Sequence, residues 1–567
     1  MPQNKVRGND SNTDHALVEP RPLWWPTPLK ILLVMLIFMA IRQMRPLETY
    51  YPVIWPDGWG YLLPALRWMN DGALETIYSR TFGYPLFLTV VLQVTKSFLM
   101  LGIVQKALNV LGGLLILSVM ADIIRVNSSG KIKLVSSWLF VLGFIWLYLG
   151  SPTIVWYEHF IQPEAIAPFI MALFIYFSWL AARKLIRGES FILPVFLLAL
   201  ISVAAYFHKP NWGFAVMSPI ILFLLLKAAY NAKLINPVAV YLLLLALLFA
   251  PLLLWQKYLS RHDPAAVTFT PTTLFTWHLG GIKGLLEDDL KAEHPPFDRA
   301  LIKSVNDMIE RQSEMDRSRK IWYPSLGYNP DELYYSPSGY AAVARLNKLT
   351  PQGQKAFFMH YYYRYVLTSP GTYLNKILGQ LAIYYRWNPR LYRVDGYNEF
   401  GDVKAVLQAA GGNISRNEDA LPFLREYLKA LRQKIDGQAI FTLQVSPLKK
   451  AVYGALRIIY YPLMLAVLGV YCLLAYFKRK KGVDISSAGL LLTVMSLTCF
   501  GAAFLADLTV AAVHSLDVGR YFDYHYTLTL ASQWLALSAL VWSLTDWVRL
   551  RKIRGPINPA TNQVSVN

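Results

Sequence analysis

The sequence predicts an all-α membrane protein that crosses the bilayer many times. Hydrophobic residues make up 55% of its 567 residues and only 16% are charged, whereas about a quarter of a typical soluble protein is charged. The apolar residues gather in runs that approach the roughly 20 residues a helix needs to cross a bilayer. Positive charge is concentrated in every second short loop between these runs, as is typical of polytopic membrane proteins.

Ten segments have the length and composition of transmembrane helices. We expect them at 29–45, 101–124, 134–150, 160–182, 190–207, 212–230, 237–257, 452–477, 486–508 and 527–547. They divide the chain into an amino-terminal tail (1–28), a membrane core (29–257) with a first outer loop at 46–100, an outer region (258–451), a carboxyl-terminal membrane part (452–547) and a second tail (548–567).

Lysine and arginine set the expected orientation of these segments. With the amino terminus inside, the inner loops contain basic clusters such as those at 183–187 and 478–481. The short outer loops at 151–159, 208–211 and 509–526 contain only Lys209 and Arg520. We therefore expect both tails in the cytoplasm and the protein in the plasma (inner) membrane of the cell. The net charge of +20 is accounted for by this topology and by anionic membrane lipid, so no nucleic-acid partner is expected.

The first outer loop is expected to hold two helices on the membrane surface, at roughly 59–70 and 84–97. The second of these is apolar but too short to cross a bilayer. A crossing there would also place every later basic cluster outside, so an in-plane or re-entrant helix fits better.

The outer region at 258–451 is polar and mixed in composition, and we expect it to be mostly helical. Its stretch at 339–387 is rich in tyrosine and basic residues. Two arrangements fit this stretch equally well. It could lie along the membrane surface with its aromatic residues toward lipid, or it could form part of a packed helical domain.

Ionisable and aromatic residues near the apolar runs collect on the outer face. Four segments contribute them: Asp57, Arg80 and Tyr84; Glu158, His159 and Glu164; His208 and Lys209; and His514, Asp517, Arg520, Tyr521 and Tyr524. Ionisable groups are costly at membrane depth and usually face protein or a wet cavity, where they have a function. An active or transport site that opens outward would account for their position.

These residue types suit the transfer of a group from phosphate to a hydroxyl. A carboxylate such as Asp57 can accept the proton of an attacking hydroxyl, and Arg80, Lys209 and Arg520 can bind a phosphate. Structural functions compete with these: a turn acid for Asp57, a lysine reaching the interface for Lys209, and an interfacial anchor for Arg520. For Glu164 we expect only a cap at the start of a helix. Because no nucleotide pool exists outside the membrane, a sugar donor there would be carried on a lipid phosphate.

The first outer loop resembles that of the GT-C glycosyltransferases, which include the protein O-mannosyltransferases and the lipid A aminoarabinose transferases. The stretch WPDGWGYLLPALRWMNDGALETIYSRTFGYPLFLTVVLQ (55–93) has an acid before an aromatic-rich helix, then Arg, Gly-Tyr-Pro and an apolar helix. WYEHFIQPEAIAPFIMAL (156–173) is similar to the second outer loop of the family, which also supplies an acid. HSLDVGRYFDYHYTLTLASQWL (514–535) is similar to a late His…Arg-Tyr element of bacterial members.

The resemblance implies an inverting transfer of a sugar from a polyprenyl-phosphate donor to a hydroxyl of a glycan, lipid or protein at the outer face. The residues it assigns are Asp57 and Glu158 as catalytic groups, Arg80, Lys209 and Arg520 at the donor phosphate, and Tyr84, His159, His514 and Tyr521 at the substrate. The loop lacks the paired acids of many members. The use of a metal, including a divalent cation, is therefore left open.

Two other functions fit parts of the pattern. A flippase or transporter of lipid-linked sugars would also present outward-facing ionisable groups, but such proteins usually contain repeated halves and broken helices at mid-membrane. A polymerase or ligase of lipid-linked glycans would also use basic residues of the outer face. A large outer loop between late spans fits that class, whereas an acid directly after the first span does not.

Overall fold

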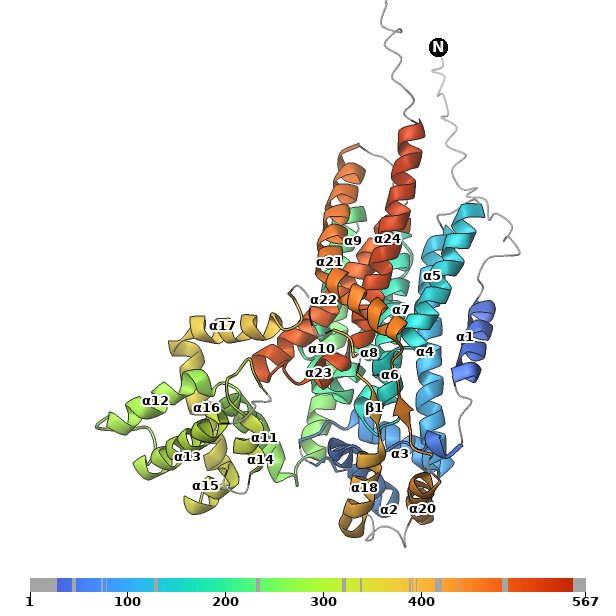
Figure 1. Cartoon of the computed structure of the whole chain (residues 1–567). Coiled ribbons are helices and arrows are strands. Elements are labelled where there is room, and N and C mark those ends of the chain that lie inside the picture. Colours follow the sequence, from blue (N-terminus) through green and yellow to red (C-terminus); the bar gives the residue numbers. More distant parts are fainter. Residues whose placement is uncertain are drawn as a thin grey trace, which may run out of the picture.

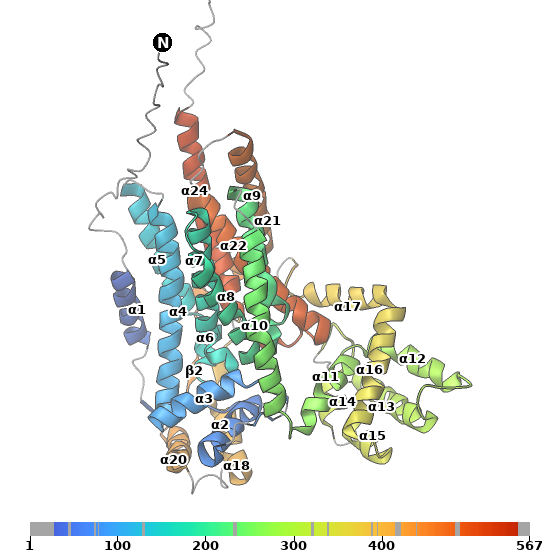
Figure 2. The same cartoon turned by 180° about the vertical axis from the view of Figure 1, so that it is seen from behind.

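The computed structural model describes the chain from residue 28 to residue 553, apart from gaps at 43–46, 73–74, 78, 127–130, 231–234, 319–322, 337–338, 387–388, 390, 394, 414–420, 438 and 482–487. The long helices form a bundle (Figures 1 and 2). Helices of the outer loops gather at one end of the bundle, and a lobe of shorter helices extends to one side (Figure 1).

Each of the ten predicted transmembrane segments overlaps a helix. The helices are α1 (Pro28–Arg42), α4 (Phe98–Val126), α5 (Lys131–Leu149), α7 (Ala167–Ile186), α8 (Ile192–His208), α9 (Ser218–Tyr230), α10 (Ile235–Leu259), α21 (Pro447–Lys481), α22 (Ala488–Val513) and α24 (Tyr526–Ile553). Residues 160–166 and 212–217 of these segments precede α7 and α9, however, and residues 43–45 and 486–487 lie outside the described part of the chain. Within the described residues, six helices are long and apolar enough to cross a membrane: α4, α7, α10, α21, α22 and α24. The apolar parts of α1, α5, α8 and α9 are shorter. An all-α membrane protein is therefore confirmed, whereas a total of ten crossings stays a prediction.

The first outer loop contains two helices close to the predicted positions. The chain passes through the 3-10 turns η1 (Leu47–Tyr50) and η2 (Pro56–Gly58) into α2 (Trp59–Asp71), and later into α3 (Gly83–Thr95). Gly72 ends α2 in the left-handed conformation, with φ +68°, which a residue without a Cβ atom adopts readily. Both helices have 13 residues, which is too short to cross a bilayer.

A short parallel β-bridge joins the first and second outer loops. The backbone N–H of Val53 donates to the carbonyl oxygen of His159 (2.7 Å), and the N–H of Ile161 donates to that of Val53 (2.9 Å). Gly58 packs so closely here that a Cβ atom would lie 2.6 Å from the carbonyl oxygen of Ile161. The other outer loops form α6 (Pro152–Tyr157), η3 (Pro163–Ala165), η4 (Pro210–Trp212), η5 (Phe214–Met217) and α23 (Gly519–Asp523).

The outer region divides into two parts, of which the first is the lobe. Its helices are α11 (Pro264–Thr276), α12 (Leu279–Lys291), α13 (Arg299–Arg317), α14 (Pro330–Tyr335), α15 (Tyr340–Leu346) and α16 (Pro351–Thr368), and α17 (Pro370–Leu381) connects the lobe to α22. The lobe has a hydrophobic core of its own, in which Phe275 and Tyr361 are fully buried. Asp263 and Thr350 cap α11 and α16 by accepting hydrogen bonds from backbone N–H groups. The stretch at 339–368 is thus part of a packed helical unit.

The second part of the outer region packs against the end of the bundle. It consists of β1 (Tyr397–Asn398), α18 (Phe400–Asn413), α20 (Pro422–Asp436) and β2 (Thr442–Leu443), and the two strands pair antiparallel. The hydroxyl of Tyr427 donates to the carbonyl oxygen of Pro52 (2.8 Å), and Lys434 forms a fully buried ion pair with Glu399 (2.7 Å). Lys434 also donates to the carbonyl oxygen of Tyr51 (3.2 Å), so Tyr427 and Lys434 hold this part beside the first outer loop.

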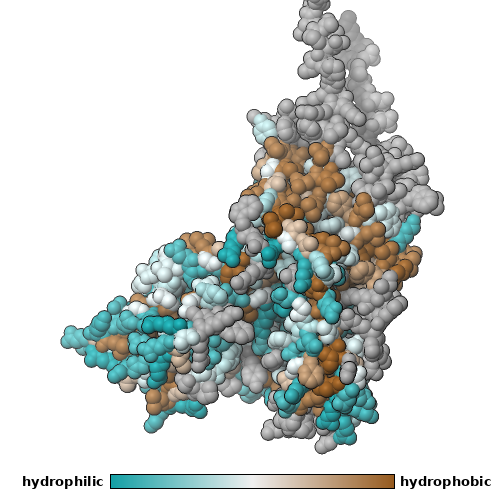
Figure 3. Space-filling view, viewed as in Figure 1, coloured by the Kyte–Doolittle hydropathy of each residue, from teal (hydrophilic) through white to brown (hydrophobic). Residues whose placement is uncertain are grey.

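The surface of the bundle differs from that of the lobe. Much of the bundle surface is apolar, whereas the lobe is largely polar (Figure 3). Helix α10 lies on the outside of the bundle in Figure 2, and its Leu243, Leu247 and Leu254 are exposed. Exposed leucines along a long apolar helix are expected where the helix faces lipid rather than water.

Candidate functional site

Asp57 lies between two arginines at the end of the bundle. It belongs to η2, and its Oδ1 atom accepts a hydrogen bond from Nη2 of Arg80 (2.8 Å), which precedes α3. Its Oδ2 atom pairs with Nη1 of Arg520 in α23. The three side chains are between 23% and 29% exposed. Three separate segments therefore bring one acid and two guanidinium groups to a place that a ligand can reach.

A second ion pair lies next to this group and is buried. Lys209, after α8, pairs with Glu164 of η3, and their side chains are only 7% and 2% exposed. The ring of Tyr521 joins the two pairs, since its centre lies 5.3 Å from Nζ of Lys209 and 5.4 Å from the guanidinium carbon of Arg520. We call this set of six residues the Asp57 site: Asp57, Arg80, Glu164, Lys209, Arg520 and Tyr521.

Two further tyrosines border the Asp57 site. The ring centre of Tyr61, on α2, lies 5.1 Å from the guanidinium carbon of Arg80. The ring of Tyr524 lies 5.6 Å from Nζ of Lys209, and its hydroxyl is 3.0 Å from Nδ1 of His208. Burial raises the pKa of Tyr61, while the charge of Arg80 acts in the opposite direction. The Tyr61 hydroxyl therefore stays neutral at physiological pH and can donate or accept a hydrogen bond.

Residues from α10 and from the start of the lobe fix the backbone around Arg80. Gln256 of α10 donates from Nε2 to the carbonyl oxygen of Arg80 (3.1 Å) and accepts from the N–H of Phe82 (3.0 Å). Ser79 has φ +55°, and its N–H donates to Oδ2 of Asp263 (2.8 Å). A serine in this left-handed conformation is strained, so the surrounding contacts must hold it there.

Both arginines retain capacity for a further acceptor. The Nε atoms of Arg80 and Arg520 are buried and have no hydrogen-bond partner among the described residues. Leaving a buried donor unpaired costs free energy, and buried polar groups in proteins are nearly always bonded. With Lys209, the site also has three cations against the two carboxylates of Asp57 and Glu164. The site is therefore suited to an anion with several acceptor oxygens, such as phosphate.

Two of the other predicted substrate residues border the Asp57 site. Tyr84 lies edge-on to Tyr61, with 5.5 Å between the ring centres, and is fully buried. His514 lies behind Tyr521, and its Nε2 atom is 3.2 Å from the Tyr521 hydroxyl. Burial lowers the pKa of His514 to about 3, with a smaller contribution from the charge of Lys376. The imidazole is thus neutral at physiological pH.

Glu158 and His159 point to different surroundings. Glu158 is fully buried and accepts a hydrogen bond from Nδ2 of Asn109 on α4 (3.3 Å). His159 stacks on Phe441, just before β2, with 3.6 Å between the ring centres. The structure thus places these two residues toward α4 and the second part of the outer region.

The expectation that Glu164 only caps a helix is wrong. Helix α7 begins at Ala167 rather than at residue 160, so Glu164 lies outside it, in η3. Its carboxylate pairs with Lys209, 45 residues away in the sequence. A pair at this separation has no local sequence signal, and the only hint is that each residue adjoins a proline in a short outer loop. Gln256, in an apolar helix, gave no signal either.

A metal site has no candidate ligand set in the part of the chain that is described. No group of three His, Cys, Asp or Glu side chains lies close enough together there to hold a metal ion. Asp57 and Glu164 each face a cation instead. The use of a divalent cation is therefore still left open.

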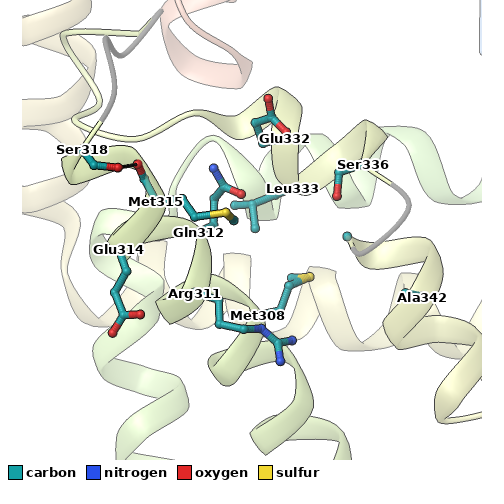
Figure 4. A pocket seen from close by; sticks show the side chains of 11 residues that line it. Met308, Arg311, Gln312, Glu314, Met315, Ser318, Glu332, Leu333, Ser336 and Ala342 are labelled. Atoms are coloured by element: carbon teal, nitrogen blue, oxygen red, sulfur yellow. Dashed lines mark hydrogen bonds between the residues drawn. The ribbon is translucent and has the colours of Figure 1, made fainter.

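A cavity of about 790 Å³ lies in the lobe, between α13, α14 and α15 (Figure 4). Met308, Gln312 and Leu333 are among the residues that line it. Gln312 already donates to Asp316 (2.8 Å). No member of the Asp57 site lines this cavity. Its charged lining residues are Arg311, Glu314 and Glu332, so it has one cation, whereas the Asp57 site has three. It is therefore the weaker candidate for a site of chemistry.

Comparison with family models, with curated proteins and with solved structures gives no match for this chain. The fold and the site therefore define its class by their geometry alone. It is an all-α membrane protein with a cationic, carboxylate-containing site at one end of its helix bundle.

Proposed function

We propose that this protein is an inverting glycosyltransferase of the GT-C type, which moves a sugar from a polyprenyl-phosphate donor to an acceptor hydroxyl. The observation that carries the proposal is Asp57 between Arg80 and Arg520 at the end of a membrane bundle, with Nε of each arginine unpaired among the described residues. One base and two phosphate-binding groups in contact are what such a transfer needs.

The proposed reaction begins when the donor phosphate takes over hydrogen bonds that Arg80 and Arg520 make to Asp57. The freed carboxylate accepts the proton of the acceptor hydroxyl, whose oxygen attacks the anomeric carbon. The bond from this carbon to the phosphate oxygen breaks, and its electron pair leaves with the phosphate. Arg80 and Arg520 stabilise the added negative charge, and Lys209 contributes from the adjacent pair. Attack opposite the leaving group inverts the configuration.

We assign the second acid of the site to Glu164 rather than to Glu158. Glu164 pairs with Lys209 beside Tyr521, whereas Glu158 accepts a hydrogen bond from Asn109. Glu164 would hold Lys209 in place and limit the positive charge around the donor. Glu158 is left with a structural function in this proposal.

The proposed orientation places the Asp57 site outside the cytoplasm of the plasma (inner) membrane, with both tails inside. The distribution of lysine and arginine among the loops supports this orientation. The grouping of the outer-loop helices at one end of the bundle is consistent with it (Figure 1). A lipid-linked donor would then enter from the outer leaflet, and the acceptor would be a glycan, a lipid or a protein.

The proposal is tested with purified protein in lipid vesicles, a panel of polyprenyl-phosphate sugars and a cell-envelope extract as the source of acceptor. Release of free polyprenyl phosphate is followed for wild type, Asp57→Asn and Asp71→Asn. Asp71 is a matched control because it is an exposed acid of the same outer loop. Loss of a general base costs on the order of 100-fold or more in rate.

We expect wild type and Asp71→Asn to release polyprenyl phosphate at similar rates, and Asp57→Asn to release it at least about 100-fold more slowly. An Asp57→Asn variant as active as wild type would rule out Asp57 as the base. If neither wild type nor the two variants release polyprenyl phosphate, but wild type moves labelled donor between the two leaflets, a flippase is the better description of this protein.

A further inference from the structure

Helix α17 of the outer region has a single charged residue. Its sequence is PGTYLNKILGQL, whereas α13 of the lobe, RALIKSVNDMIERQSEMDR, carries many charges. The one charge, Lys376, does not face solvent freely. Its Nζ atom donates to the carbonyl oxygens of Ala511 and His514, at 2.7 Å each. The exposed side of α17 therefore carries no charge.

That exposed side carries two leucines beside the uncharged residues Gly371, Thr372, Asn375 and Gly379. Leu374 and Leu378 are 54% and 53% exposed, and because they are four residues apart they lie on one face of the helix. Tyr363 and Leu367, near the end of α16, are also four residues apart and are 56% and 80% exposed. Figure 3 shows apolar residues along the upper edge of the lobe, where α17 lies in Figure 1. Several large apolar side chains exposed on neighbouring helices mark contact with a membrane or another protein.

The depth of α17 relative to the bilayer follows from α22. The part of α22 from Gly489 to Val513 is long and apolar enough to cross a membrane. The two carbonyl groups that Lys376 bonds lie at the end of this helix: Ala511 is in its last turn, and His514 directly follows it. From there α17 runs across the direction of the bundle helices (Figures 1 and 2). A helix that starts at the end of a span and runs across it lies in the plane of the membrane–water boundary.

We propose that α17 and the end of α16 lie in the outer surface of the bilayer, with Tyr363, Leu367, Leu374 and Leu378 in contact with lipid. Lipid fits better than a protein partner, because the face is uncharged and continues from the end of a transmembrane helix. The contact anchors the lobe to the membrane. It thereby also supports Asp263, at the start of α11, which holds Ser79 next to Arg80. The inference does not depend on the proposed transferase activity.

The proposal is tested by measuring the depth of spin labels in the full-length protein. Cys472→Ser and Cys499→Ala first remove the two native cysteines, and the protein is placed in vesicles of phosphatidylcholine and phosphatidylglycerol. Single labels are attached through Leu367→Cys, Leu374→Cys and Leu378→Cys. Leu346→Cys is the matched control, because Leu346 is a 75% exposed leucine of α15, which lies in the lobe away from α17 (Figure 1).

We expect labels at 367, 374 and 378 to collide several-fold more with dissolved oxygen than with a water-soluble nickel chelate, and the label at 346 to show the reverse. Access of the chelate to all four positions alike would overturn the proposal, because the face would then be in water. Protection of the three positions from both reagents would also overturn it and would indicate a protein partner or a second copy. Thermal unfolding of each variant is compared with that of the cysteine-free parent. Because three positions are labelled, the test still holds if one variant fails to fold.

Discussion

The buried pair of Lys209 and Glu164 leads to a quantitative prediction. Glu164→Gln keeps the shape of the side chain but leaves the charge of Lys209 in surroundings that are only 7% exposed. Removing one partner of a buried ion pair typically costs about 3–5 kcal/mol, since the remaining charge keeps its desolvation cost but loses its counter-ion. The nearby rings of Tyr521 and Tyr524 can return only about 0.5–2 kcal/mol of this through cation–π contacts.

The double variant Glu164→Gln/Lys209→Met removes both charges together with their desolvation cost. It should therefore regain most of the stability that Glu164→Gln alone loses. The assay is unfolding in a denaturing detergent, followed by tryptophan fluorescence. Glu189→Gln is the matched control, because Glu189 pairs with Lys184 on the surface, where the two side chains are 39% and 42% exposed. That variant should unfold like wild type.

Two results would refute this reasoning. If Glu164→Gln unfolds at the same denaturant concentration as wild type, the pair does not have the buried environment described above. If the double variant is as unstable as Glu164→Gln, the loss comes from altered packing rather than from an unpaired charge.

Three further predictions concern neighbours of the site. Gly58→Ala should lower both donor turnover and the unfolding temperature, because its methyl group would meet the carbonyl oxygen of Ile161, whereas Gly284→Ala, with open space around it, should change neither. The pKa of His514 is about 3 in the folded protein against an ordinary 6.5, so as pH falls the unfolded chain binds a proton before the folded protein does. The free energy of unfolding, measured at a series of pH values, should therefore decrease between about pH 6.5 and pH 3. The decrease should be smaller in His514→Phe. Gln256→Leu should reduce donor turnover. Adding Gln256→Leu to Arg80→Gln should reduce turnover little further than Arg80→Gln alone, because Gln256 acts by holding Arg80.

The helices themselves were predictable from local composition. In lipid, backbone polar groups have no water to bond, so a long apolar run such as that of α4 or α10 must form a helix. The short helices α2 and α3 were predictable for a related reason, because turn signals such as Gly72 separate two apolar stretches that are each too short to cross. The concentration of ionisable residues in the outer loops could likewise be read directly from the sequence.

The pairing of those residues could not be read in the same way. Arg520 reaches Asp57 from near the other end of the chain, and Glu164 reaches Lys209 because α7 begins later than its apolar run suggests. The division of the outer region into a packed lobe and a part held by Tyr427 beside the first loop was equally hidden. Local composition sets which segments become helices, but the contacts between loop side chains depend on how those helices pack. That packing depends on many weak contacts between segments that are distant in the sequence, so it cannot be read from any single stretch.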